Sequence, residues 1–153
     1  MSESYTPGYS EGAIAFMLRR RLDPNGEFFR AHLQSGMRVL DCGCGPGTIT
    51  CDIARIVRPA QVIGVDANAS QLEIAEKNAE SLELENIAFR QADVYSLPFD
   101  DAQFDAVFSH ALLEHLSDPQ RAADEFFRVL RPGGAVGVCT PDWGGFLVAP
   151  PSP

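Results

Sequence analysis

The chain has 153 residues, of which 45% are apolar and 22% charged, the balance of one soluble globular domain. Its formal net charge of −9 argues against partners that need a basic surface, such as nucleic acid or anionic lipid. No apolar run approaches the roughly 20 residues of a membrane span, and the polar N-terminus has the pattern of neither a signal nor a transit peptide. We therefore expect a cytoplasmic protein without nucleic-acid or membrane partners, whose four cysteines are reduced.

The first part of the chain, residues 1–34, is expected to form an N-terminal helical cap. Residues 11–34 have a helical pattern, which a turn at 23–26 (DPNG) divides into two segments. The only basic run, Arg19 to Arg21, falls within this region. We interpret it as the solvated face of a helix rather than as a nucleic-acid patch.

Short apolar runs alternate with helical patterns between residues 35 and 140. The predicted strands are 37–41, 61–66, 86–91, 104–109 and 135–140, and the predicted helices are 48–57, 70–84 and 119–130. Such an alternation requires right-handed crossovers between parallel strands. The sequence therefore predicts an α/β fold, a Rossmann-like doubly wound parallel sheet with the strand order 3-2-1-4-5.

The ends and faces of two of these helices can also be predicted. Ser70 or Asn68 is expected to cap the second helix, whose inward residues are Leu72, Ala75, Ala79 and Leu82. Asp118 followed by proline is expected to open the third helix, and the Arg-Pro-Gly-Gly sequence at 131–134 is expected to end it.

The stretch VLDCGCGPGT at 39–48 admits two readings, a metal or redox site and a glycine loop. A zinc site needs four ligands, usually in pairs two to four residues apart, but Cys42 and Cys44 are separated by only one residue. Cys51 and Cys139 complete no such pattern, and a thioredoxin-like motif needs two intervening residues. We therefore predict no metal site, and we expect Cys42 and Cys44 to fill small spaces beside the loop.

The glycine reading fits the surrounding pattern better. Gly43, Gly45 and Gly47 follow a predicted buried strand and open a helix, where α/β folds bind ligands. A dinucleotide-binding loop would have its third glycine at position 48, where this chain has threonine, which counts against NAD and FAD. Asp66 ends the next strand, where its two oxygens could accept both hydroxyls of a ribose, cap the following helix, or do both.

Four segments in succession, VLDCGCGPGT, VIGVDAN, ADVYSLPFDDAQFDAVFSHALLEHL and FFRVLRPGGAVGV, resemble the ordered motifs of class I S-adenosylmethionine-dependent methyltransferases. The resemblance runs from about residue 35 to 142. It is strongest to the small-molecule group that includes the ubiquinone and menaquinone biosynthesis methyltransferases. It implies S-adenosylmethionine as cofactor, methyl transfer to a small-molecule acceptor, and a cofactor-binding domain over 35–140.

The resemblance also implies roles for particular residues. Backbone groups of the glycine loop and Asp41 would hold the methionine end of the cofactor, Asp66 its ribose, and Asp93 and Val94 its adenine. The full set of implied cofactor-binding residues is Tyr5, Tyr9, Asp41, Gly43, Gly45, Gly47, Asp66, Ala67, Asp93, Val94 and Ser109.

The acceptor side of the site is less defined by the sequence. His110 and His115 follow the fourth strand and are candidate general bases, although a surface or capping role is the preferred interpretation for either residue. His110 and Glu114 are four residues apart, which predicts that they share a helix face.

The Pro-rich segment 141–153 has no room for the helix and antiparallel hairpin that complete the family's sheet. We expect either a truncated chain or a naturally short protein. An S-adenosylmethionine-binding module without its own turnover is therefore the alternative function, and an NAD-dependent oxidoreductase is a third. The fifth strand would be left as an uncharged edge, which predicts a homodimer through residues 135–148 or a tail that folds back over the edge.

Overall fold

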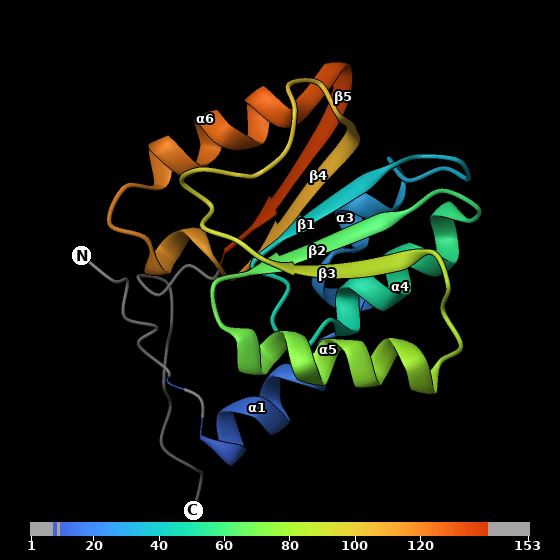
Figure 1. Ribbon diagram of the computed structural model, residues 1–153, viewed down its shortest axis with the longest axis vertical. Helices are drawn as coiled ribbons and strands as arrows, with labels where there is room; N and C mark the ends of the chain where they lie inside the picture. The colour runs from blue at the N-terminus through green and yellow to red at the C-terminus, as the bar shows by residue number, and fades with distance from the viewer. Residues whose placement is uncertain (1–7, 9, 141–153) are drawn as a thin grey trace, which may run out of the picture.

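The computed structural model describes residue 8 and residues 10–140. Tyr5, Tyr9 and the segment 141–153 lie outside this range, together with the predictions made for them. A five-stranded parallel sheet in the order β3-β2-β1-β4-β5 forms the centre of the domain (Figure 1), which confirms the predicted fold class and strand order. The strands are β1 (Val39–Cys42), β2 (Val62–Asp66), β3 (Ile87–Gln91), β4 (Phe104–His110) and β5 (Leu130–Cys139).

Helices cover both faces of this sheet. Helices α4 (Thr48–Val57) and α5 (Ala69–Ser81) lie on one face and α6 (Pro119–Val129) lies on the other, as Figure 1 shows. Asn68 caps α5 and Asp118 caps α6, each by accepting a backbone N–H through its side chain. The capping residue of α6 was predicted, and for α5 the structure selects one of the two predicted candidates.

The N-terminal region differs from the prediction. In place of two longer helical segments it contains three short ones, α1 (Glu11–Met17), α2 (Leu22–Asn25) and α3 (Glu27–Arg30). The basic run lies in the connection between α1 and α2, so the prediction that it forms a helix face is wrong. Helices of four residues are not stable alone. They persist here because Leu22 and Phe29 are buried in the core beneath α4.

Side-chain alternation along the strands decides which residues reach the α4 side of the sheet. In β1, Val39 belongs to the core under α4, whereas Leu40 and Cys42 belong to the core under α6. Asp41 therefore faces α4. The same alternation in β4 places Phe108 on the α4 side, and His110 follows it two residues later.

Two boundaries differ from the sequence prediction. Helix α5 ends at Ser81 rather than 84, because Glu83 adopts a positive φ of 52° and reverses the chain. Leu82 is consequently exposed and Leu84 takes the buried position, so the inward prediction for Leu82 is wrong. Strand β5 begins at Leu130 rather than 135, because the backbone continues as strand directly after α6.

Aromatic contacts help to attach the N-terminal segment to the sheet. Phe29 of α3 packs against Phe108 of β4, with ring centroids 5.2 Å apart. It also covers Gly137 of β5, where a Cβ atom would overlap the Phe29 ring. The absence of a side chain at position 137 thus lets α3 lie close to the strands.

Gly47 has a packing role that gives a testable prediction. Its φ is +73°, and a Cβ atom there would lie 2.7 Å from the Cβ of Ala75 and 2.9 Å from Cζ of Phe89. We expect Gly47→Ala to reduce the free energy of unfolding by about 2–4 kcal/mol, since it adds overlap to the strain of a positive φ. Denaturant titration followed by circular dichroism measures this loss.

Gly36→Ala is the matched control. Gly36 also has a positive φ, +89°, but a Cβ atom there would meet nothing within 4 Å. Its loss of about 1 kcal/mol would report the backbone strain alone. Equal losses in the two variants would show that Gly47 is not tightly packed.

Candidate functional site

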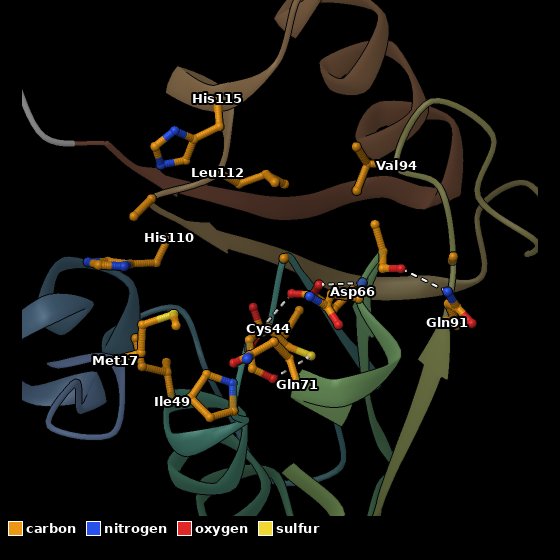
Figure 2. Close-up of a pocket in the computed structure, with 18 of the residues that line it drawn as sticks. Met17, Cys44, Ile49, Asp66, Gln71, Gln91, Val94, His110, Leu112 and His115 are labelled. Atoms are coloured by element: carbon orange, nitrogen blue, oxygen red, sulfur yellow. Dashed lines mark hydrogen bonds between the residues drawn. The ribbon is translucent and has the colours of Figure 1, made fainter. Parts of the chain in front are cut away.

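A cavity of about 900 Å³ opens at the carboxyl ends of the strands. Its walls come from the segments that follow β1, β2, β3 and β4, and from the connection after α1. The position lies beside the switch between β1 and β4, where the strand order reverses and α/β sheets bind ligands. In Figure 2, Asp66, Gln91 and Val94 lie on one side of Cys44, and Met17, His110 and His115 lie on the other.

The glycine loop forms the floor between these two sides. Gly43 and Gly45 line the cavity with φ values of +73° and +52°, which residues with a Cβ rarely adopt. The amide of Gly45 donates to Oδ2 of Asp66 at 2.9 Å and so ties the loop to the tip of β2. Gly47, in contrast, is absent from the cavity wall and packs against α5 and β3.

Asp66 is held by the backbone on both of its oxygens. Oδ2 accepts the Gly45 amide, and Oδ1 accepts the Asn68 amide at 2.9 Å. The helix cap is Asn68, whose Oδ1 accepts the Ser70 amide at 2.9 Å, so the interpretation of Asp66 as the helix cap is wrong. Burial raises the pKa of Asp66, and the backbone hydrogen bonds oppose this rise. Each carboxylate oxygen keeps acceptor capacity for one further donor from the cavity.

Gln71 is a cavity residue that the sequence analysis missed. It lies in the first turn of α5 and is only 1% exposed, yet within the described part of the chain neither Nε2 nor Oε1 has a hydrogen-bond partner. A buried amide without partners costs free energy, so this wall favours a ligand that offers both a donor and an acceptor. The sequence spacing could have predicted that Gln71 faces inward, because it precedes Ala75 by four residues on the buried face of α5.

Asp41 lies beneath the glycine loop on the α4 side. It is 2% exposed, and Oγ1 of Thr50 donates to its Oδ2 at 2.6 Å. Burial raises the pKa of Asp41 to about 7, with the hydrogen bond from Thr50 lowering it and the nearby Asp66 raising it. A positively charged ligand in the cavity would therefore favour the ionised form of Asp41.

The remaining residues implied by the resemblance divide into two groups. Ala67, Asp93 and Val94 line the cavity, and Oδ1 of Asp93 accepts the Tyr95 amide at 2.9 Å. Ser109 does not line it. Its hydroxyl donates to the carbonyl of Cys42 at 3.0 Å and is buried, whereas its neighbours on the strand, Phe108 and His110, reach the cavity.

His110 and His115 both line the cavity, but not as residues of one helix. Strand β4 continues to His110, and only a 3-10 turn, Leu113–His115, follows it, so the predicted helix face shared by His110 and Glu114 is wrong. Burial and the positive charge of Arg20 lower the pKa of His110, while Glu114 raises it. The net lowering leaves a neutral imidazole at pH 7, which can accept a proton.

Cys42 and Cys44 lie near each other without forming a ligand set. Cys42 is buried, and Cys44 lines the cavity with its thiol 3.7 Å from the carbonyl oxygen of Gly45. Burial raises the pKa of both thiols well above the usual range, which opposes the thiolate form that metals bind. Among residues 8 and 10–140, no group of three His, Cys, Asp or Glu side chains is placed to hold a metal ion.

The double substitution Cys42→Ala/Cys44→Ala tests this reading. We expect ligand affinity within a few-fold of the wild type, because neither thiol donates to the cavity residues that carry charge. Metal analysis of the purified wild-type protein is expected to find no stoichiometric zinc. Bound zinc that disappears in the double variant would contradict the second expectation, and a larger loss of ligand affinity would contradict the first.

Comparison with known proteins identifies the family. Residues 33–148 match the family described as "Methyltransferase domain". This chain belongs to that family. It is 45% identical over 105 residues to an uncharacterized methyltransferase of Schizosaccharomyces pombe, covering 65% of this chain and 38% of the relative. It is 40% identical over 102 residues to a ubiquinone biosynthesis O-methyltransferase of Alkalilimnicola ehrlichii, covering 66% of this chain and 40% of the relative.

Solved structures give the same family and a wider range of reactions. The structure of a SAM-dependent methyltransferase from Methanosarcina mazei matches with a TM-score of 0.64 and 32% identity, covering 71% of this chain and 54% of that protein. The [4+2]-cyclase SpnF matches with a TM-score of 0.66 and 33% identity over 83% of this chain and 43% of its own. This chain thus spans about half or less of the length of these four proteins.

Proposed function

We propose that this domain binds S-adenosylmethionine in the cavity and transfers its methyl group to a small-molecule acceptor. The observation that carries the proposal is that two sides of one cavity offer different chemical groups to a ligand. One half holds the anchored Asp66 carboxylate and the unpartnered amide of Gln71, and the other holds the neutral imidazole of His110.

The first half fits a nucleoside. The two oxygens of Asp66 each have acceptor capacity left, as two vicinal ribose hydroxyls require, and Gln71 offers a donor and an acceptor in the same wall. Asp93 and Val94 would hold the adenine from the segment after β3. The glycine loop and Asp41 would hold the amino-acid end.

When bound, the cofactor supplies an electrophilic methyl group on a sulfonium. The work left to the protein is to orient the acceptor and exclude water, which supplies on the order of 7–11 kcal/mol in favourable cases. An ionised Asp41 would balance positive charge near the loop. His110 would accept the proton of a hydroxyl acceptor, because its lowered pKa keeps the ring neutral.

The small-molecule acceptor is proposed from two supports. A relative 40% identical to this chain is named for an O-methylation step in ubiquinone biosynthesis. The acidic surface implied by a net charge of −9 is also unfavourable for nucleic acid. No described helix has the length and apolar character needed to cross a bilayer.

Calorimetric titration with S-adenosylmethionine and S-adenosylhomocysteine tests the binding step, with NADH as the control nucleotide. We expect saturable heat with the first two ligands and none with NADH. A screen of small-molecule acceptors with labelled methyl donor then tests turnover. Label transferred to a product supports the enzyme, whereas binding without any transfer supports the alternative of a module without turnover. Saturable NADH binding alone would overturn the proposal in favour of an oxidoreductase.

Self-association through β5 is a separate prediction. Within the described sheet, β5 pairs only with β4, and Val138 on this strand is 37% exposed. We expect a two-fold dimer that pairs this edge with its copy. Sedimentation at micromolar concentration measures it. A soluble monomer with the same behaviour after removal of residues 142–153 would rule the dimer out.

A further inference from the structure

The basic run separates into three different environments. Arg19 is exposed, and Arg21 forms an ion pair with Asp52 at 2.5 Å. Arg20, between them, is partly buried and lines the cavity. The separation arises because the connection between α1 and α2 is not helical, so consecutive side chains point in different directions.

Among the described residues that line the cavity, Arg20 is the single Lys or Arg. Across residues 8 and 10–140 it makes no ion pair, although five other arginines do; these are Arg21, Arg30, Arg55, Arg128 and Arg131. Its guanidinium lies 5.4 Å from the ring centroid of Phe16. The other described arginines without an ion pair lie outside the cavity wall, so Arg20 is set apart by combining an unpaired guanidinium with a place in that wall.

Glu114, which acts on the same imidazole as Arg20, and the acidic groups Asp41 and Asp66 of the cavity wall have other contacts. On the acceptor side, Oε2 of Glu114 accepts the Thr140 hydroxyl at 2.6 Å, and its Oε1 lies 3.8 Å from Nε2 of His115. On the other side, Asp41 is bonded to Thr50, and Asp66 is bonded to two backbone amides. The five donors of the Arg20 guanidinium are therefore available to a ligand.

The place of Arg20 limits which part of a ligand it can meet. Three residues before it, Met17 lies against the glycine loop, since a Cβ atom on Gly45 would be 3.9 Å from the Met17 sulfur. The charge of Arg20 also lowers the pKa of His110, so the two side chains lie near each other in the cavity wall. Arg20 thus lies near His110, which Figure 2 shows on the opposite side of Cys44 from Asp66.

We infer that Arg20 binds a carboxylate of a ligand in this cavity. The planar guanidinium matches the two oxygens of a carboxylate by paired hydrogen bonds. The inference rests on the proposed function, which offers two sources for this group: the amino-acid end of the cofactor, and an acidic group on the acceptor.

Binding measurements on three proteins distinguish these sources. Wild type, Arg20→Ala and the matched control Arg19→Ala are titrated with S-adenosylhomocysteine and with methylthioadenosine, a thioether nucleoside without the amino-acid end. If the cofactor supplies the carboxylate, Arg20→Ala weakens S-adenosylhomocysteine binding by about 10- to 100-fold and leaves methylthioadenosine binding unchanged. Arg19→Ala changes neither. Unchanged methylthioadenosine binding also shows that the variant is folded.

Benzoate, titrated into protein saturated with S-adenosylhomocysteine, tests the acceptor as the source. Binding of benzoate to wild type and Arg19→Ala, but not to Arg20→Ala, assigns the carboxylate to the acceptor. The inference is overturned if Arg20→Ala alters neither S-adenosylhomocysteine nor benzoate binding, or if it weakens both nucleosides equally.

Failure of the proposed function would look different. Wild-type protein that binds neither nucleoside contradicts cofactor binding, and benzoate is then titrated alone. Arg20-dependent benzoate binding in that case keeps the inference, and its absence removes it.

Discussion

Replacement of Asp66 by alanine is expected to weaken S-adenosylhomocysteine binding by about 10- to 100-fold, the cost of two charge-assisted hydrogen bonds from a ribose. The substitution also leaves the Gly45 and Asn68 amides without their acceptor. We therefore expect a loss of about 1–3 kcal/mol in the free energy of unfolding as well, without unfolding the domain. Calorimetry and denaturant titration measure the two effects on the same samples.

Asp118→Ala is the matched control for Asp66→Ala. Asp118 also accepts a backbone amide, that of Arg121 at 3.1 Å, but it caps α6 and does not line the cavity. Its removal should cost about 1 kcal/mol of stability and leave affinity unchanged. If Asp66→Ala binds S-adenosylhomocysteine as tightly as wild type does, the Asp66 carboxylate only stabilises the glycine loop and does not contact the ligand.

Replacement of Asp41 by asparagine is expected to raise stability and lower affinity. The pKa of Asp41 is about 7 in the folded protein against 3.8 as its ordinary value. The contribution of Asp41 to stability is therefore most favourable below about pH 4, where this group is protonated in both states, and falls as the pH rises towards 7 and the group ionises only in the unfolded state. The difference corresponds to about 4 kcal/mol as an upper bound. Asparagine keeps an acceptor for Thr50 without the charge, so Asp41→Asn should recover much of this loss at pH 7.

The affinity for S-adenosylmethionine should depend on pH in the opposite direction to this contribution to stability. A cationic ligand favours ionised Asp41, so binding of S-adenosylmethionine should strengthen as the pH rises towards 7 and release a proton. Asp41→Asn should bind more weakly at pH 8 and lose this pH dependence. Asp124→Asn, an exposed carboxylate on α6, is the control and should follow wild type in both measurements. If the unfolding free energy of Asp41→Asn follows that of wild type from pH 4 to 8, the buried carboxylate carries no such penalty.

Much of the sheet and its helices could be predicted because strand and helix periods are local properties. The helix at 48–57 agrees to the residue with α4, and four of the five strands agree within two residues at each end. The glycine loop and Asp66 could be placed at the sheet edge for the same reason. Parallel strands that end together bring their following residues together.

The errors arise where tertiary contacts decide. The short N-terminal helices depend on the burial of Leu22 and Phe29, which no local pattern reveals. Gln71 and Arg20 become cavity residues only after α5 and the connection between α1 and α2 are placed on the sheet. Ser109 stays a prediction, because the resemblance assigns its role to the backbone carbonyl, whereas the alternation of β4 turns only its side chain into the core.

The contact of Phe29 with Gly137 couples two positions more than 100 residues apart in the chain. Because Phe29 occupies the space that a side chain at 137 would fill, the two positions are not free to vary independently during evolution. Homologues with alanine or a larger residue at the position of Gly137 should carry a smaller residue at that of Phe29, or lack α3 altogether. The segment that brings Met17 and Arg20 to the cavity would then be inherited or lost together with that glycine.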